Sequence, residues 1–167
     1  MKKTMLVVLA EGFEDIEAIA PIDVLTRAGC EVTVAGLVEG PVKAAYGTTI
    51  VPQTTLDKVG DTLFDGIFFP GGRKNAQALA ADRRVVQVAR LHYEAGKLVS
   101  AICAAPSHVL GEAAGLLKGK RASGDPSFND KLAASGAIVT DQMVTVDGNL
   151  ITGVGPGAAM LFALQVT

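Results

Sequence analysis

Short apolar runs alternate with longer amphipathic segments along this chain, and the alternation predicts a sheet covered by helices. Residues 4–10 (TMLVVLA) are continuously apolar, which is typical of a strand buried on both faces of a parallel sheet. Residues 15–28 place apolar side chains at helical spacing and are followed by Gly29, a residue that favours the end of a helix. Pro21 lies within that segment, where a helix tolerates it only at an exposed kink or in the first turn.

The same alternation continues to the end of the chain. Further strands are predicted at residues 31–37, 64–69, 97–102, 137–139, 143–146 and 150–152, a short hairpin at 40–47, and helices at 75–95, 104–114 and 157–167. Strands separated by segments of helix length imply parallel pairing with right-handed crossovers. We therefore predict a three-layer α/β/α sandwich with a mostly parallel sheet, formed by a single domain over residues 1–167.

Composition and charge narrow the classes of partner. Hydrophobic residues make up 49% of the chain and charged residues 19%, which is enough apolar material for a core. The formal net charge is −2, so we expect no basic surface for nucleic acid. No apolar run reaches the ~18 residues of a membrane-spanning helix, and the apolar N-terminal stretch has no small-residue cleavage site behind it. We expect a cytoplasmic protein that does not bind membranes.

The cysteines and histidines are too few and too scattered for a disulfide framework or a metal centre. Cys30 and Cys103 lie far apart in the sequence, which favours a reducing compartment. Neither His92 nor His108 has cysteine or carboxylate partners at the spacing of metal ligands, so we expect no metal. We interpret Cys30 and His92 as structural. With 3.6 residues per turn, His108 faces away from Cys103 and is expected on the helix surface.

Cys103 directly follows the predicted strand 97–102 and begins the next helix. Ligands of open parallel sheets bind beyond the carboxyl ends of the strands. The small residues Ala101 and Ala105 flank the cysteine as in the layout of a nucleophile elbow. The start of a helix favours the thiolate, which predicts a lowered pKa for Cys103. A buried, inert cysteine is the alternative, and sequence position alone leaves it open.

Glu17 is the predicted partner of this cysteine. It lies in the helix after the first strand, and we expect that strand to neighbour the strand that ends at Cys103. A protonated carboxyl donates a hydrogen bond to sulfur and stabilises the anion. Glu14 and Asp15, by contrast, are interpreted as acidic residues that favour the start of the helix.

Two further segments at strand ends offer backbone groups. Gly71 and Gly72 are predicted to bring N–H groups to a developing oxyanion, with the Ala104 N–H as a second donor, although Pro-Gly-Gly is equally consistent with an ordinary turn. Residues 153–158 (GVGPGA) match the spacing of a dinucleotide fingerprint. Only nine residues of the sequence follow, so the remaining βαβ unit and its acidic residue are missing. We interpret that segment as a turn and expect no organic cofactor.

In order and spacing, seven segments of the chain resemble the ThiJ/PfpI superfamily, and within it the branch of the parkinsonism-associated protein deglycase. The segments are 12–18 (GFEDIEA), 21–25 (PIDVL), 27–29 (RAG), 32–35 (VTVA), 69–72 (FPGG), 101–106 (AICAAP) and 155–157 (GPG). The resemblance implies a flavodoxin-like sandwich, a homodimer, and Cys103 as a reactive thiolate with Glu17 as its protonated partner. It further implies that Arg27, Gly155 and Pro156 lie near the dimer contact.

The chain also departs from the pattern of that family. Several relatives carry a histidine near the thiol, where this chain has residues 124–126 (GDP), so Asp125 becomes the candidate third member of the site. Relatives that hydrolyse peptides or convert glyoxals often have a histidine directly after the nucleophile. Here Ala104 follows Cys103, so we expect no protease. The sequence stops at Thr167, before a last helix that relatives usually have, and we expect a shortened C-terminal helix.

Two functions follow from the resemblance and the candidate residues. The first is a slow enzyme without metal or cofactor that acts on small reactive carbonyls, converting methylglyoxal to lactate or removing glycation through Cys103 and Glu17. The second is an oxidative-stress sensor or redox-regulated chaperone in which Cys103 is oxidised to a sulfinate. Both use the same thiol, so the sequence does not separate them.

Overall fold

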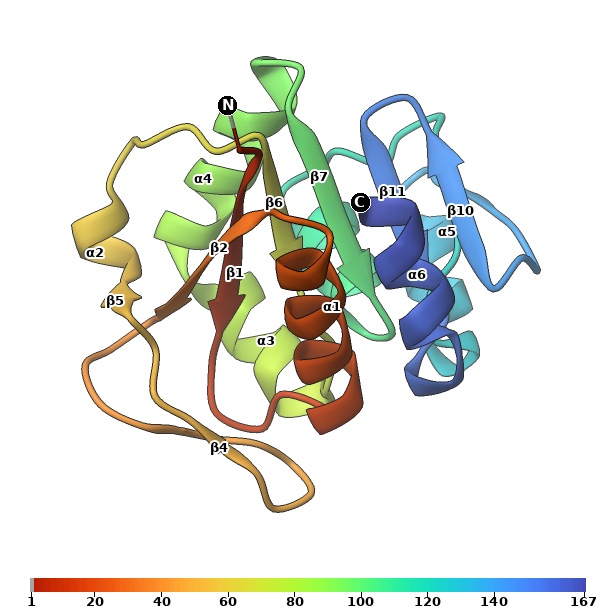
Figure 1. Ribbon diagram of the computed structural model, residues 1–167. Coiled ribbons are helices and arrows are strands. Elements are labelled where there is room, and N and C mark those ends of the chain that lie inside the picture. Colours follow the sequence, from red (N-terminus) through yellow and green to blue (C-terminus); the bar gives the residue numbers. More distant parts are fainter. Residues whose placement is uncertain (1) are drawn as a thin grey trace.

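A seven-stranded sheet forms the middle layer of the protein. The computed structural model describes residues 2–167 (Figure 1). The strands lie in the spatial order β10 (Val144–Asp147), β11 (Leu150–Gly153), β7 (Leu98–Ile102), β6 (Gly66–Phe69), β1 (Thr4–Leu9), β2 (Glu31–Gly36) and β5 (Thr54–Thr55). All neighbouring pairs are parallel except β10 and β11. The order β2-β1-β6-β7-β11 is that of flavodoxin-like folds, which confirms the predicted architecture.

Helices cover both faces of this sheet. Figure 1 shows α1 (Asp15–Arg27) and α6 (Ala159–Val166) side by side on one face. The other face carries α2 (Leu56–Val59), α3 (Arg73–Ala81), α4 (Arg83–Glu94), the π-helix η1 (Pro106–Ala113) and α5 (Asn129–Ala134). The short elements are the hairpin β3 (Val42–Lys43) and β4 (Thr49–Ile50), the pair β8 (Arg121–Ala122) and β9 (Ile138–Val139), and the 3-10 turns η2 (Pro126–Phe128) and η3 (Pro156–Ala158).

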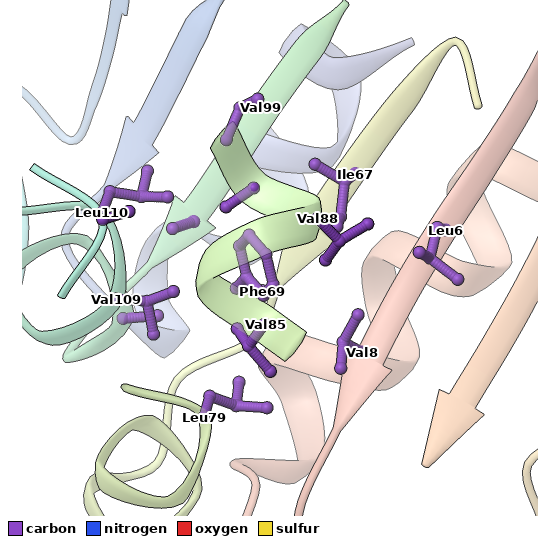
Figure 2. Close-up of a cluster of buried hydrophobic side chains, with 14 of the residues drawn as sticks. Leu6, Val8, Ile67, Phe69, Leu79, Val85, Val88, Val99, Val109 and Leu110 are labelled. Atoms are coloured by element: carbon purple, nitrogen blue, oxygen red, sulfur yellow. The ribbon is translucent and has the colours of Figure 1, made fainter. Parts of the chain in front are cut away.

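Strand β1 shows why both faces are apolar. Leu6 and Val8 point into the core beneath α3, α4 and η1, which Figure 2 shows in close-up, whereas Val7 and Leu9 point toward α1 and α6. Successive side chains of a strand point to opposite faces, so a strand covered on both sides must be apolar throughout. The continuous apolar run predicted as a buried strand is therefore confirmed.

Some local predictions are wrong for identifiable reasons. The single helix expected at 75–95 is divided by Asp82, whose backbone is extended and whose carboxylate accepts a hydrogen bond from the Arg84 N–H to begin α4. The strand expected at 137–139 is present as β9, which pairs with β8 outside the central sheet. Helix α1 runs through Pro21 as one element. Strands β5 and β8 and helices α2 and α5 were not predicted, since each is too short to show a period.

His92 is structural, as predicted. Its ring is fully buried on α4; Nε2 accepts a hydrogen bond from the Phe64 N–H at 3.0 Å and Nδ1 lies 2.8 Å from the Val88 carbonyl oxygen. It thereby ties α4 to the segment that leads into β6.

Two absences hold for the described part of the chain. None of its helices is long and apolar enough to cross a membrane. Within residues 2–167, no three histidine, cysteine, aspartate or glutamate side chains are grouped so that they would hold a metal ion.

Candidate functional site

Cys103 lies in a strained turn between β7 and η1. Its φ is +64°, and it is the one non-glycine residue between positions 2 and 167 with a positive φ. Two backbone hydrogen bonds hold this conformation, one from the Cys103 N–H to the Gly153 oxygen at 2.9 Å and one from the Asp125 N–H to the Cys103 oxygen at 2.8 Å. A left-handed backbone costs about 1–3 kcal/mol at such a residue and presents the side chain at the end of the strand. The turn resembles the predicted elbow.

Glu17 approaches Cys103 through a gap at Gly71. The expectation that β1 neighbours β7 is wrong, because β6 lies between them. The two side chains nevertheless meet over the end of β6, where the chain has glycine. A Cβ atom at Gly71 would lie 2.1 Å from Glu17 Oε2 and 2.5 Å from Cys103 Cβ, distances that no side chain can occupy. Gly71 thus serves the site first by lacking a side chain.

The Glu17 carboxyl is buried without a complete hydrogen bond. Its side chain is 0% exposed, and neither oxygen has a hydrogen-bond partner of adequate geometry among the described residues. Burial raises the pKa of Glu17 to about 7, and the negative charge of Glu14 adds to the rise. The nearby Cys103 thiol and Gly71 N–H oppose this rise only in part. Glu17 therefore keeps a proton to a pH at which ordinary carboxyls have lost theirs.

The Cys103 thiol also resists ionisation in this environment. Burial raises its pKa, the adjacent Glu17 carboxyl raises it further, and the charge of Asp125 adds a smaller contribution in the same direction. The Gly72 N–H acts oppositely. The lowering predicted from the helix start is thus outweighed by burial. A thiolate at neutral pH requires that the proton of the pair reside on Glu17.

Glu14 and Asp15 are structural, and each does more than favour a helix start. Glu14 Oε2 accepts a hydrogen bond from the Glu17 N–H at 2.8 Å and so caps α1. Asp15 accepts from the Tyr46 N–H at 2.8 Å and the Thr48 N–H at 2.9 Å. The Glu14 cap fixes the start of the helix that carries Glu17. Asp15 holds the β3–β4 hairpin beside the site.

Gly72 lies against the Cys103 thiol, and Ala104 follows Cys103 in the chain. Gly72 has a φ of +89°, and a Cβ there would lie 2.2 Å from the Gly12 oxygen, so only glycine fits. Its N–H faces the Cys103 sulfur. The Ala104 N–H follows Cys103 directly and opens the turn into η1. The Gly72 N–H is therefore placed to meet negative charge on the sulfur, whereas the role of the Ala104 N–H stays a prediction.

Asp125 lies beside the thiol, whereas His108 lies in the layer behind it. Asp125 Oδ2 is 3.8 Å from Cys103 Sγ. Asp125 Oδ1 accepts a hydrogen bond from the Ser127 N–H at 2.9 Å, which caps the start of η2.

The expectation of an exposed His108 is wrong. The side chain is 4% exposed, its Nδ1 lies 2.9 Å from the Ala104 oxygen, and its ring meets the edge of Phe128. The wider π-helical turn of η1 changes the direction that a 3.6-residue period predicts.

The thiol opens into a cavity of about 670 Å³, a size typical of small-molecule sites. The cavity is lined by Glu11, Gly12, Glu14, Glu17, Ala44, Ala45, Tyr46, Gly72, Arg73, Lys74, Cys103, Asp125 and Pro156. Lys74 pairs with Glu11 at 2.8 Å, and the Arg73 guanidinium lies 5.3 Å from the centre of the Phe128 ring. The hairpin residues and the two cations were not predicted, since nothing local in the sequence places them at the site.

The residues expected at a dimer contact are separated in the protomer. Gly155 is buried near Glu17, and the exposed Pro156 lines the cavity. Arg27 is exposed and paired with Asp23 at 2.7 Å, near the far end of α1. Arg27 comes ten positions after Glu17 in α1, a rise of about 15 Å along the helix. Arg27 therefore lies outside the cavity.

Known proteins resemble the chain over nearly its whole length. The model of the DJ-1/PfpI family matches residues 3–167. Protein dj-1beta of Drosophila melanogaster is 42% identical over 99% of the chain and 88% of its own length. Protein DJ-1 homolog A of Arabidopsis thaliana is 39% identical over 98% of the chain, but the chain spans only 42% of that relative.

Two similar proteins bear the names of enzymes. Deglycase TK1284 of Thermococcus kodakarensis is 32% identical over 92% of the chain and 90% of its own length. Glutathione-independent glyoxalase DJR-1.2 of Caenorhabditis elegans is 34% identical over 99% of the chain and 87% of its own length.

Solved structures share the fold described above. The crystal structure of Drosophila melanogaster DJ-1beta superposes with a TM-score of 0.95 at 41% identity and covers 99% of this chain and 89% of that one. Oxidized Toxoplasma gondii DJ-1 superposes with a TM-score of 0.92 at 34% identity and covers 98% of this chain and 88% of that one. By its sequence, its fold and its relatives, the chain belongs to the DJ-1/PfpI family.

Proposed function

We propose that the protein is a cofactor-free enzyme that converts small 2-oxoaldehydes such as methylglyoxal to 2-hydroxy acids. The observation that carries this proposal is the Cys103 thiol in a strained turn, beside a buried carboxyl that retains its proton to about pH 7. A nucleophile next to a proton donor and acceptor is the minimum that such chemistry needs. The names of the deglycase and glyoxalase relatives support the same class of substrate.

The reaction begins when Cys103 Sγ adds to the aldehyde carbon. The new C–S bond converts the carbonyl oxygen into an oxyanion that the Gly72 and Ala104 N–H groups stabilise, and this oxyanion takes the proton of Glu17, which becomes a carboxylate. The Glu17 carboxylate then removes the proton from the former aldehyde carbon and returns it to the neighbouring carbon, while the hydroxyl proton of the adduct passes to the oxygen on that neighbouring carbon. The product is a 2-hydroxyacyl thioester. Water hydrolyses it, which releases the 2-hydroxy acid and restores the thiol.

This scheme leaves the site with weak general-base assistance. Asp125 stands beside the sulfur, but Ser127 and the cap of η2 already occupy one of its oxygens. General acid–base assistance is worth about 100-fold to 10,000-fold, so an incomplete set predicts slow turnover. Removal of glycation from amines or thiols would use the same addition to Cys103.

A second candidate function is a redox sensor or redox-regulated chaperone. The specific observation in its favour is that Cys103 combines an opening to the cavity with a carboxyl neighbour able to hydrogen-bond a sulfinate. The Toxoplasma gondii relative was solved in an oxidized form. In this function peroxide supplies the oxygen atoms and turnover of carbonyls is incidental.

We also propose that the protein forms a homodimer through α1 and α6. Both helices expose large apolar side chains to solvent, namely Ile16, Ile19, Met160, Leu161 and Leu164. Exposed apolar side chains gathered on neighbouring helices are typical of an interface between subunits. The exposed Pro156 at the start of η3 lies between this surface and the cavity, so the partner subunit would border the site.

Lactate formation from methylglyoxal should depend on Cys103 and not on Cys30. Substitution Cys103→Ala removes the nucleophile and should reduce lactate production to the uncatalysed rate. Substitution Glu17→Gln leaves the nucleophile but should lower kcat by about 100-fold or more. Lactate is measured by an enzyme-coupled assay, with Cys30→Ala as the matched control. Turnover that survives in Cys103→Ala would refute the proposed enzyme.

Stability should fall with rising pH because of Glu17. Its folded pKa of about 7 lies above the ordinary value of 4.5, so the folded state binds the proton more tightly than the unfolded state does. The free energy of unfolding therefore decreases between about pH 4.5 and 7, by at most about 3 kcal/mol. Urea unfolding of Glu17→Gln should lack this decrease, whereas Glu31→Gln, on the exposed edge of β2, should retain it. Equal slopes in both variants would contradict the assignment.

Mild peroxide should oxidise Cys103 selectively if the second candidate holds. Two added oxygen atoms raise the mass of the Cys103 peptide by about 32 Da, and the Cys30 peptide should stay unchanged. Peptide mass spectrometry after graded peroxide exposure measures both. Clean oxidation without lactate formation would favour the sensor, and equal oxidation of both cysteines would exclude it.

The dimer should dissociate when a charge is placed on α6. Leu164 is 59% exposed, and Leu164→Lys should bury a lysine in the interface and yield monomer in sedimentation velocity. Val51→Lys, at a 73% exposed position outside both helices, should remain dimeric. A monomeric wild-type protein at micromolar concentration would rule out this assembly.

A further inference from the structure

One peptide group joins the loop after β6 to the reactive sulfur. The peptide between Gly71 and Gly72 packs on Cys103, since a Cβ at Gly71 would lie 2.5 Å from Cys103 Cβ. Its N–H, which belongs to Gly72, faces the sulfur and favours the ionised form. The orientation of this single peptide therefore decides whether the sulfur meets an N–H or a carbonyl oxygen.

Asn75 holds that peptide from the side away from the sulfur. Its side chain is fully buried in the first turn of α3. The Asn75 amide donates to the Pro70 oxygen at 2.8 Å and to the Gly71 oxygen at 3.1 Å, while its own oxygen accepts from the Ala10 N–H at 2.7 Å. One side chain thus ties the end of β6 to the end of β1, the strand that leads to the loop before Glu17.

A planar trans peptide transmits this contact to the sulfur. The C=O and N–H of such a peptide point in opposite directions, so a donor that fixes the Gly71 carbonyl also directs the Gly72 N–H. Glycines flank the peptide on both sides, and no Cβ hinders its rotation. The Glu14 N–H is a second donor to the same carbonyl, at 3.1 Å. Donors on the carbonyl also polarise the N–H at the other end, which strengthens its hydrogen bond to an anion.

We propose that Asn75 is a positioning residue that locks the Gly71–Gly72 peptide with its N–H toward Cys103, and so stabilises negative charge on the sulfur. For turnover the role rests on the proposed function, because the same N–H then faces the oxyanion of the adduct. The effect of Asn75 on the ionisation of the Cys103 thiol does not depend on any substrate. Asn75 could not be recognised from the sequence, since an asparagine in a first helical turn is ordinary.

The test measures the pH dependence of Cys103 alkylation by iodoacetamide, in a Cys30→Ala background with a single thiol. Loss of one directed hydrogen bond to an anion should raise the apparent pKa by about one unit in Asn75→Ala, or slow alkylation about tenfold below that pKa. Asn149 is the matched control, since its amide also donates to two backbone carbonyls, those of Tyr93 and Lys97. These carbonyls precede the start of β7, whereas Cys103 follows its end. Asn149→Ala should keep the wild-type midpoint.

The midpoint of the alkylation titration distinguishes a positioning role of Asn75 from a purely structural one. A purely structural role would lower the unfolding temperature in both variants and leave both midpoints unchanged, and that result would overturn the proposal. Should Asn75→Ala not fold, nuclear magnetic resonance of the Cys30→Ala protein decides, because the Gly72 amide proton should shift with the Cys103 titration and not in Cys103→Ala. A Gly72 amide that ignores the titration would equally overturn it. Neither readout requires lactate formation, so failure of the proposed enzyme would be seen separately.

Discussion

The burial of one proton between Glu17 and Cys103 is the constraint on which the site depends. Both groups resist ionisation because both are removed from water, and among residues 2–167 neither Glu17 oxygen has a hydrogen-bond partner of adequate geometry. An uncompensated buried carboxyl destabilises the fold once it ionises. The protein thus tolerates a local defect in stability to keep an acid poised near neutral pH, an arrangement found at functional sites far more than elsewhere.

Backbone geometry supplies most of what surrounds this proton. The strained turn at Cys103, the N–H groups of Gly72 and Ala104, and the gap at Gly71 are properties of the main chain. Hydrogen bonds to neighbouring strands hold them, such as that from the Cys103 N–H to Gly153 on β11. The site is therefore held by the strand ends that carry it, and side chains form the wall of the cavity beside it.

The sheet and the position of Cys103 at the end of a strand could be predicted because each leaves a local signal, whereas the pairing of Glu17 with Cys103 was expected from the family resemblance and from a strand order that the structure does not have. Apolar runs mark the strands, and the cysteine directly follows one of them. What failed depends on tertiary placement: β6 separates β1 from β7, and the π-helical turn buries His108. Asn75 left no local signal, because its three partners come from the ends of two strands. Periodicity indicates which face of an element is apolar, but not which polar atoms meet across elements.

The gap at Gly71 also limits which substitutions the site tolerates during evolution. A single added methyl group there would collide with both the acid and the thiol while touching little of the apolar core. The pairing of acid and thiol can therefore be lost in one step. Within such a family, members that keep the fold without this pair would be expected to arise most easily at this position.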